Sequence, residues 1–245
     1  MMKCSEVCER IKEIGIVPAI RVSSAEDAHF AADSVARGGI SIVEITMTVP
    51  EAVELISHLV RHHQKMIVGA GTVLDTETAR RCVDAGASFL TAPGLDPAVV
   101  EFATKQGIAV LPGALTPTEV MTAWRAGADF VKVFPCAQVG GDKYIKALKT
   151  ALPQIRLIAA GGVNQQTAAG FILAGADAIG IGTELIPMGA IERREADRIR
   201  ELAHRFLGFV NDARRRLTPQ QKKDAGATDK TDFLRLDKRP QPAKS

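Results

Sequence analysis

The chain has 245 residues, of which 46% are hydrophobic and only 4% aromatic, and its formal net charge is +3. Residues 218–245 contain seven Lys or Arg and four Asp or Glu residues, so residues 1–217 are formally neutral. A neutral body presents no broad basic face, which argues against nucleic acid as a partner and favours a small-molecule substrate.

The first fifteen residues, MMKCSEVCERIKEIG, have charges throughout and lack the apolar core of a signal peptide. No run of about 18 apolar residues occurs, so no membrane-spanning helix is predicted. The cysteines are scattered and show neither CxxC spacing nor a disulfide framework. We therefore expect a soluble, cytoplasmic protein with the reduced cysteines Cys4, Cys8, Cys82 and Cys136.

Eight short apolar runs, rich in Val, Ile and Phe, recur at intervals of 20 to 26 residues. Each interval contains an amphipathic stretch that is long enough for a helix, so strands and helices are predicted to alternate. The runs are VPAIRV (from Val17), IVEITM (Ile42), MIVGAGTV (Met66), FLTAPG (Phe89), AVLPGA (Ala109), FVKVFP (Phe130), RLIAAGGV (Arg156) and AIGIGTEL (Ala178).

A glycine stands between helix and strand in four of these units, at Gly39, Gly86, Gly127 and Gly175. A helix C-terminus favours a residue that tolerates positive φ, so these glycines are predicted to end helices. Repeated strand–helix units form a parallel sheet. Eight of them favour closure into a (β/α)₈ TIM barrel over an open, doubly wound sheet. We predict one such α/β domain over residues 1–217.

The last helix is predicted over residues 190–217. The polar, Pro-containing segment that follows, residues 218–245, is predicted to be a disordered tail. Its FLRL patch leaves a docking segment open as the alternative.

Side chains alternate along a strand, so residues of the same parity share one side of the barrel wall. Lys132 shares parity with Phe134, and Glu44 with its neighbours Ile42 and Thr46. By the same rule, Arg21 shares parity with Ala19, and Thr72 shares parity with Val68 and Ala70. If these parities point inward, an amine, a carboxylate, a guanidinium and a hydroxyl converge inside the barrel.

Lys132 is the residue with the most specific chemistry. Burial between two valines disfavours the charged ammonium form, and a free amine is the nucleophile that carbonyl condensation requires. The alternative is a lysine that only pairs with Glu44 or reaches solvent through the helix layer. Glu44 itself could be a simple ion-pair partner, or it could move protons between water and the reaction intermediates.

Two further features point to binding of an anionic substrate. Arg21 lies near the C-terminal end of the first strand, and a guanidinium there suits a carboxylate. Loops after the seventh and eighth strands form the recurrent phosphate site of such barrels. We therefore predict phosphate binding by Gly161, Gly162, Gly182 and Thr183.

The remaining motifs give weaker evidence of a functional site. His58 and His62 have the i, i+4 spacing of metal ligands, but their predicted helix, residues 51–63, lies outside the barrel, and we interpret them as part of a solvated face. Cys136 has no His or Asp at a motif spacing and is interpreted as a bystander. The sequence contains neither GxxxxGK[ST] nor a dinucleotide-binding fingerprint, so no metal and no cofactor are predicted.

The chain resembles the 2-keto-3-deoxy-6-phosphogluconate (KDPG) and 4-hydroxy-2-oxoglutarate (KHG) aldolases from about Val17 to the end of the last helix. The resemblance rests on five segments, of which GAGTV and KxFP are the most specific. They are VEITMTVP (from Val43), VGAGTVLD (Val68), TAPGLD (Thr91), VKVFPCAQVGGDKYIKALKTALP (Val131) and AAGGVN (Ala159).

The resemblance implies a metal-independent class I aldolase of carbohydrate metabolism, an aldehyde-lyase that releases pyruvate from a 2-keto-3-deoxy sugar acid or from 4-hydroxy-2-oxoglutarate. Lys132 corresponds to the Schiff-base lysine and Glu44 to the proton-shuttling glutamate. Thr72, Pro93 and Phe134 correspond to the pyruvate pocket. Members of the family are typically homotrimers, which implies a homotrimer here.

The chain departs from the family pattern at two positions. Many members have an arginine where this chain has Thr48, whereas members with a TVP motif like this one carry an arginine at the end of the first strand, as Arg21 does. Many members also have a threonine where this chain has Ala160. The backbone N–H groups of the following glycine pair remain to bind a phosphate.

Two alternatives remain open at this stage. A phosphate-binding TIM-barrel sugar isomerase or epimerase would share the glycine-rich loops but would form no imine on Lys132. A non-catalytic oligomeric barrel would bind pyruvate without cleaving any 2-keto-3-deoxy acid.

Overall fold

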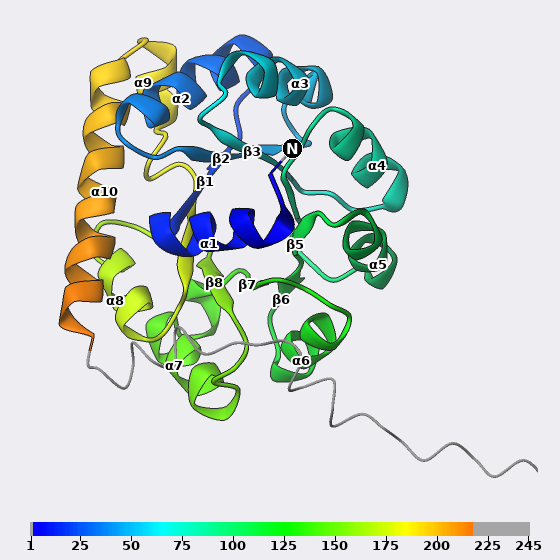
Figure 1. The fold of residues 1–245 in the computed structure, drawn as a ribbon. Coiled ribbons are helices and arrows are strands. Elements are labelled where there is room, and N and C mark those ends of the chain that lie inside the picture. The colour runs from blue at the N-terminus through cyan, green and yellow to red at the C-terminus, as the bar shows by residue number, and fades with distance from the viewer. Residues whose placement is uncertain (1, 218–245) are drawn as a thin grey trace, which may run out of the picture.

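The computed structural model describes residues 2–217, which form a closed parallel barrel ringed by helices (Figure 1). The predicted tail, residues 218–245, lies outside the described residues. Neighbouring strands pair in parallel in the order β5-β4-β3-β2-β1-β9-β8-β7-β6. The strands are β1 (Ile16–Ile20), β2 (Ile42–Thr46), β3 (Ile67–Gly71), β4 (Phe89–Thr91), β5 (Ala109–Leu111), β6 (Gly113–Ala114), β7 (Val131–Val133), β8 (Leu157–Ala160) and β9 (Ala178–Ile181).

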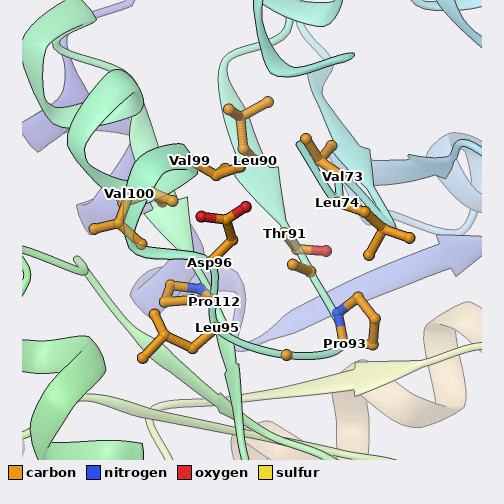
Figure 2. Close-up of a pocket in the computed structure, with 13 residues that line it drawn as sticks. Val73, Leu74, Leu90, Thr91, Pro93, Leu95, Asp96, Val99, Val100 and Pro112 are labelled. Atoms are coloured by element: carbon orange, nitrogen blue, oxygen red, sulfur yellow. The ribbon is translucent and has the colours of Figure 1, made fainter. Parts of the chain in front are cut away.

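The fifth predicted strand is split in two, with Pro112 between the halves (Figure 2). The first half, β5, pairs with β4, and the second half, β6, pairs with β7. A proline has no N–H to donate to a sheet, but the Pro112 carbonyl still accepts a hydrogen bond from the Lys132 amide at 2.9 Å. Counted as one interrupted strand, β5 and β6 complete the predicted eight-stranded barrel, which confirms the predicted fold class.

The predicted glycine stops are confirmed, since Gly39, Gly86, Gly127 and Gly175 have φ values of 94°, 100°, 108° and 103°. None of the helices in the described part of the chain is both long and apolar enough to cross a membrane. The helices around the barrel are α2 (Ala25–Arg37), α3 (Ala52–His62), α4 (Thr76–Asp84), α5 (Pro97–Gln106), α6 (Pro117–Arg125), α7 (Asp142–Ala151), α8 (Ala168–Leu173), α9 (Met188–Glu192) and α10 (Ala196–Arg216), and a 3₁₀ turn spans Ala137–Val139.

The single helix predicted over residues 190–217 is wrong, because α9 and α10 divide this region. The break contains Arg194, whose φ of 53° is incompatible with a continuous right-handed helix. The Arg194 guanidinium forms ion pairs with Glu26 at 2.7 Å and with Asp27 at 3.0 Å. These contacts join the break to the start of α2.

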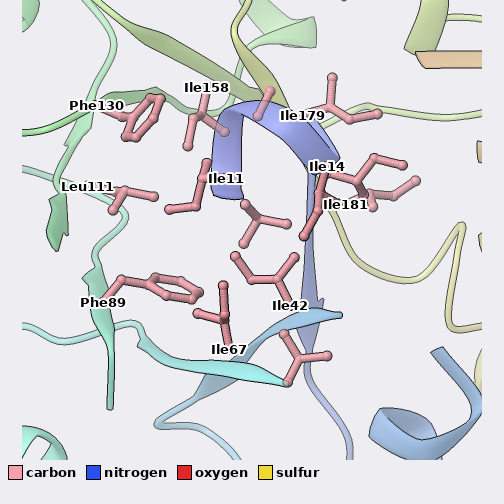
Figure 3. Packing of buried hydrophobic residues seen from close by; sticks show 14 of the residues in the cluster. Ile11, Ile14, Ile42, Ile67, Phe89, Leu111, Phe130, Ile158, Ile179 and Ile181 are labelled. Atoms are coloured by element: carbon pink, nitrogen blue, oxygen red, sulfur yellow. The ribbon is translucent and has the colours of Figure 1, made fainter. Parts of the chain in front are cut away.

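A helix that the sequence analysis did not predict, α1 (Cys4–Ile14), covers the end of the barrel where the strands begin (Figure 1). Its fully buried Ile11 and nearly buried Ile14 lie among apolar side chains from the strands (Figure 3). The labelled neighbours include Ile42, Phe89 and Phe130. Because α1 covers this end, the opposite end of the barrel, where the strands finish, is the one left for a site within residues 2–217.

Candidate active site

Lys132 is the central residue of β7 and extends from the barrel wall between two buried valines. Its Nζ lies 3.5 Å from Glu44 Oε2 on β2 and donates a hydrogen bond to Thr91 Oγ1 on β4 at 3.4 Å. The Lys132 side chain is 14% exposed and that of Glu44 only 4%. Residues from three strands therefore hold the amine in a largely enclosed position from which it still meets solvent.

Glu44 fits inside the barrel because the neighbouring strand has no side chain at Gly71. All five residues of β2 are buried, so the carboxylate has little freedom to move. A Cβ atom added to Gly71 would lie 2.0 Å from Glu44 Oε1 and 2.5 Å from its Cδ. The second glycine of the GAG segment thus provides the space that the carboxylate occupies.

The variant Gly71→Ala is expected to displace Glu44 and to reduce the aldolase activity that the resemblance implies at least tenfold. The added methyl group occupies the carboxylate position, and overpacking of this kind costs about 1–3 kcal/mol of stability. Urea unfolding and steady-state kinetics on the same preparation separate the two effects. Gly94→Ala is the control, since its added Cβ would meet nothing within 4 Å. Unchanged turnover in Gly71→Ala would refute this role of Gly71.

The sequence analysis missed Thr91. It is 2% exposed and its hydroxyl accepts the hydrogen bond from Lys132. The parity argument that was used for the other strands would have found it, because Thr91 shares its side of β4 with the buried Phe89. Strand β4 is only three residues long, so the alternation of side chains is a weaker signal there than on the longer strands.

A cavity of about 300 Å³ opens beside Lys132 at the C-terminal ends of the strands. Lys132, Glu44 and most of the residues predicted to bind substrate line this one cavity. Those substrate-binding residues are Arg21, Phe134, Gly161, Gly162, Gly182 and Thr183. Ala160 and Glu184, which were not predicted to contact substrate, line it as well.

Two of the predicted residues do not line this cavity. Thr72 follows the end of β3 with a φ of 58°, so the alternation of side chains that placed it inside no longer applies. Pro93 lines a neighbouring, mainly apolar pocket of about 250 Å³ (Figure 2). Thr91 lines that pocket too and also bonds to Lys132, so the two hollows lie side by side.

The predicted phosphate loops are shaped by glycine but do not lead directly into a helix. Gly161 and Gly162 have φ values of 81° and 84°, and a Cβ on Gly162 would lie 2.1 Å from that of Ala137. Helix α8 begins only at Ala168, after a turn, so phosphate binding by Gly161 and Gly162 stays a prediction that rests on their own backbone N–H groups. Within residues 2–217 the N–H groups of Gly162 and Thr183 donate no hydrogen bond, which leaves both available to an anion.

Cys136 follows Phe134 and Pro135, and its side chain is fully buried. Burial raises the pKa of the Cys136 thiol to about 11, so the thiol stays protonated at neutral pH and is a poor nucleophile. This agrees with its interpretation as a bystander.

Comparison with known proteins points to the same aldolase chemistry as the geometry of the site. The family model described as KDPG and KHG aldolase matches residues 7–202. The 2-dehydro-3-deoxy-phosphogluconate aldolase of Pseudomonas aeruginosa is 30% identical over 213 residues, covering 87% of this chain and 97% of that protein. The KHG/KDPG aldolase of Escherichia coli K12 is 33% identical over 189 residues, covering 77% of this chain and 88% of that protein.

A solved structure adds a chemical observation. The KDPG aldolase of Legionella pneumophila, described with pyruvate captured at low pH as a covalent carbinolamine intermediate, superposes with a TM-score of 0.75 at 28% identity. The match covers 80% of this chain and 96% of that one. The family match and these relatives extend over most of the barrel, and they favour neither an isomerase nor a non-catalytic scaffold. This chain therefore belongs to the KDPG and KHG aldolase family.

Proposed function

We propose that Lys132 is the Schiff-base lysine of this class I aldolase, which requires no metal and no cofactor. The substrate is a 2-keto-3-deoxy sugar acid, with or without a 6-phosphate, or 4-hydroxy-2-oxoglutarate, and the products are pyruvate and an aldehyde. The observation that carries the proposal is the 3.5 Å approach of Lys132 Nζ to Glu44 at the mouth of a barrel. The carbinolamine described for the Legionella pneumophila relative supports the same chemistry.

The reaction begins when the free amine of Lys132 attacks the C2 carbonyl carbon and forms a carbinolamine. Glu44 carries the proton that the Lys132 ammonium gives up on becoming an amine, and it passes this proton to the carbinolamine hydroxyl, which leaves as water and gives an iminium ion. Glu44 then accepts the proton of the C4 hydroxyl as the C3–C4 bond breaks and the aldehyde departs. The bonding electrons move into the iminium, which becomes an enamine. Glu44 returns this proton to C3 of the enamine, and hydrolysis of the resulting iminium releases pyruvate and restores the amine.

Arg21 is proposed to hold the carboxylate of the keto acid. It follows the last residue of β1, is exposed, and lines the same cavity as Lys132. A guanidinium can bind a carboxylate with two parallel hydrogen bonds. Thr72 and Pro93, whose roles in the pyruvate pocket come from the resemblance, stay predictions.

The variant Arg21→Ala is expected to raise KM for the keto acid about ten- to a hundredfold and to change kcat less. The reason is the loss of a hydrogen bond to a charged group, which contributes about 1.5–3 kcal/mol. Initial rates over a range of substrate concentrations give both constants. A KM equal to that of the unmodified enzyme would show that another group binds the carboxylate.

The far end of the cavity is proposed to hold a 6-phosphate through the amides of Gly161, Gly162, Gly182 and Thr183. Ala160 presents a methyl group there, and Glu184 adds a negative charge at the exposed rim, so the amides provide the attraction. Cleavage rates of one keto acid with and without its 6-phosphate test this arrangement. A kcat/KM at least tenfold higher for the phosphorylated compound is expected, and equal values would contradict phosphate binding.

Assembly into a homotrimer is part of the proposal, as the family resemblance implies. Leu74, a large hydrophobic residue that is 59% exposed, lines the apolar pocket next to the active site and supports burial of this face by a second copy. Light scattering should give three times the mass of one chain, and the mass of a single chain would contradict the trimer. The cytoplasmic location, expected from the scattered cysteines, stays a prediction.

A further inference from the structure

Helices α2 and α3 carry a group of imidazole and carboxylate side chains that takes no part in the proposed aldolase chemistry. His29 and Asp33 are one turn apart on α2, and His63 follows the last residue of α3. Asp33 stands between the two histidines, with its Oδ2 3.4 Å from His29 Nδ1 and its Oδ1 3.3 Å from His63 Nε2. None of the three residues lines the cavity beside Lys132.

We propose that His29, Asp33 and His63 bind a divalent transition-metal ion with the preferences of Zn²⁺. Imidazole nitrogen and carboxylate oxygen are both ligands of Zn²⁺, and bonds of about 2.0–2.1 Å at tetrahedral angles place neighbouring ligand atoms about 3.3–3.4 Å apart. Each ring nitrogen already lies at this distance from one oxygen of the Asp33 carboxylate, His29 from Oδ2 and His63 from Oδ1. The potential ligand atoms of all three residues lie within 4.8 Å of one another, so only a small approach of the two rings is needed.

An ion can reach this group from solvent. The side chains of His29, Asp33 and His63 are 36%, 30% and 27% exposed. Three protein ligands leave a fourth tetrahedral position, which a water molecule fills. The bound ion would tie α2 to the end of α3, so it would stabilise the folded state by binding it and not the unfolded chain.

The histidines next to this group provide a matched control. The ring of His58 lies 5.2 Å from that of His29, and the rings of His58 and His62 are stacked at 4.1 Å. His62 Nδ1 donates a hydrogen bond to the His58 carbonyl at 2.8 Å, which directs the ring along its own helix. His62 therefore has a side chain that could bind a metal, but it does not lie among the three proposed ligands. The variant His62→Gln should leave metal binding unchanged.

Calorimetric titration of the full-length, tag-free protein with Zn²⁺ tests the proposal on four proteins: the unmodified chain, His29→Gln, His63→Gln and His62→Gln. We expect binding by the unmodified chain and by His62→Gln, and an affinity lower by at least about tenfold in the other two. The Tm should rise with Zn²⁺ only in the proteins that bind it. Absence of binding by the unmodified chain, or equal affinity in His63→Gln, would overturn the proposal.

A second measurement does not depend on how the variants fold. In imidazole NMR spectra of the unmodified chain, Zn²⁺ should shift the signals of His29 and His63 but not those of His204 on α10. Cys4, Cys8 and Asp129 form another group with metal-ligand chemistry, so Cys8→Ser is titrated as well. Loss of Zn²⁺ binding in Cys8→Ser, with unchanged His29 and His63 signals, would assign the metal to that group and reject the present site.

Discussion

Replacement of Lys132 by methionine is expected to reduce aldol cleavage on the order of 10⁴- to 10⁶-fold, the loss that removal of a covalent nucleophile causes. Methionine has a similar length and fits the apolar wall, but it has no amine to form an imine. The Nζ contacts with Glu44 and Thr91 are lost together with the amine. Cleavage is followed through coupled detection of the released pyruvate.

Two controls make this result specific to the amine. Lys146→Met, on the outer helix α7, should retain full activity because that lysine is exposed and lines no part of the cavity. Circular dichroism should show that Lys132→Met keeps its helices, since its backbone pairing with Gly113 and Ile158 does not involve the side chain. A folded Lys132→Met enzyme with more than about 1% of the activity would mean that catalysis proceeds without an imine.

The second large effect is expected for Glu44→Gln, which should lower kcat about 10²- to 10⁴-fold, the usual contribution of a general acid or base. Glutamine has nearly the shape of glutamate and fits the space above Gly71, so the geometry is kept while proton transfer is lost. The adduct with Lys132 should still form, but more slowly. Rapid-quench measurement of both steps separates adduct formation from carbon–carbon cleavage.

Glu184→Gln is the matched control, because Glu184 also lines the cavity but is exposed at its rim. It should keep kcat within a few-fold of the unmodified enzyme. If both variants lost the same activity, the effect would come from the overall charge of the cavity. If neither did, Glu44 would be only an ion-pair partner of Lys132, the alternative that the sequence left open.

Much of the barrel could be predicted because its signals are local and repeated. Short apolar strands and amphipathic helices alternate along the chain, and four of the units carry a glycine in positive φ between helix and strand, as at Gly86 and Gly127. Side chains alternate regularly along each strand, so residues of the same parity could be predicted to share one side of the barrel wall. Arg21, Glu44 and Lys132, which this rule brought together, do line one cavity. Their convergence follows from the closure of the sheet, which brings the ends of β1, β2 and β7 to one opening.

The structure differs from the predictions made from the sequence at places where long-range contacts or the local backbone conformation decide the structure. Helix α1 is short and highly charged, and it is stabilised by burial of Ile11 against strands far along the chain. The parity rule fails at Thr72 because β3 ends at Gly71 and the backbone then adopts a positive φ. The break after α9 contains Arg194, which has a positive φ and forms ion pairs with residues at the start of the distant α2.

The most direct test of the account is to trap the imine. The protein is incubated with pyruvate, reduced with borohydride, digested, and sequenced by mass spectrometry. We predict one 1-carboxyethyl group per chain, on Lys132, and none in the Lys132→Met variant. A protein that cleaves its substrate but carries no such group, or carries it on another lysine, would contradict the proposed role of Lys132.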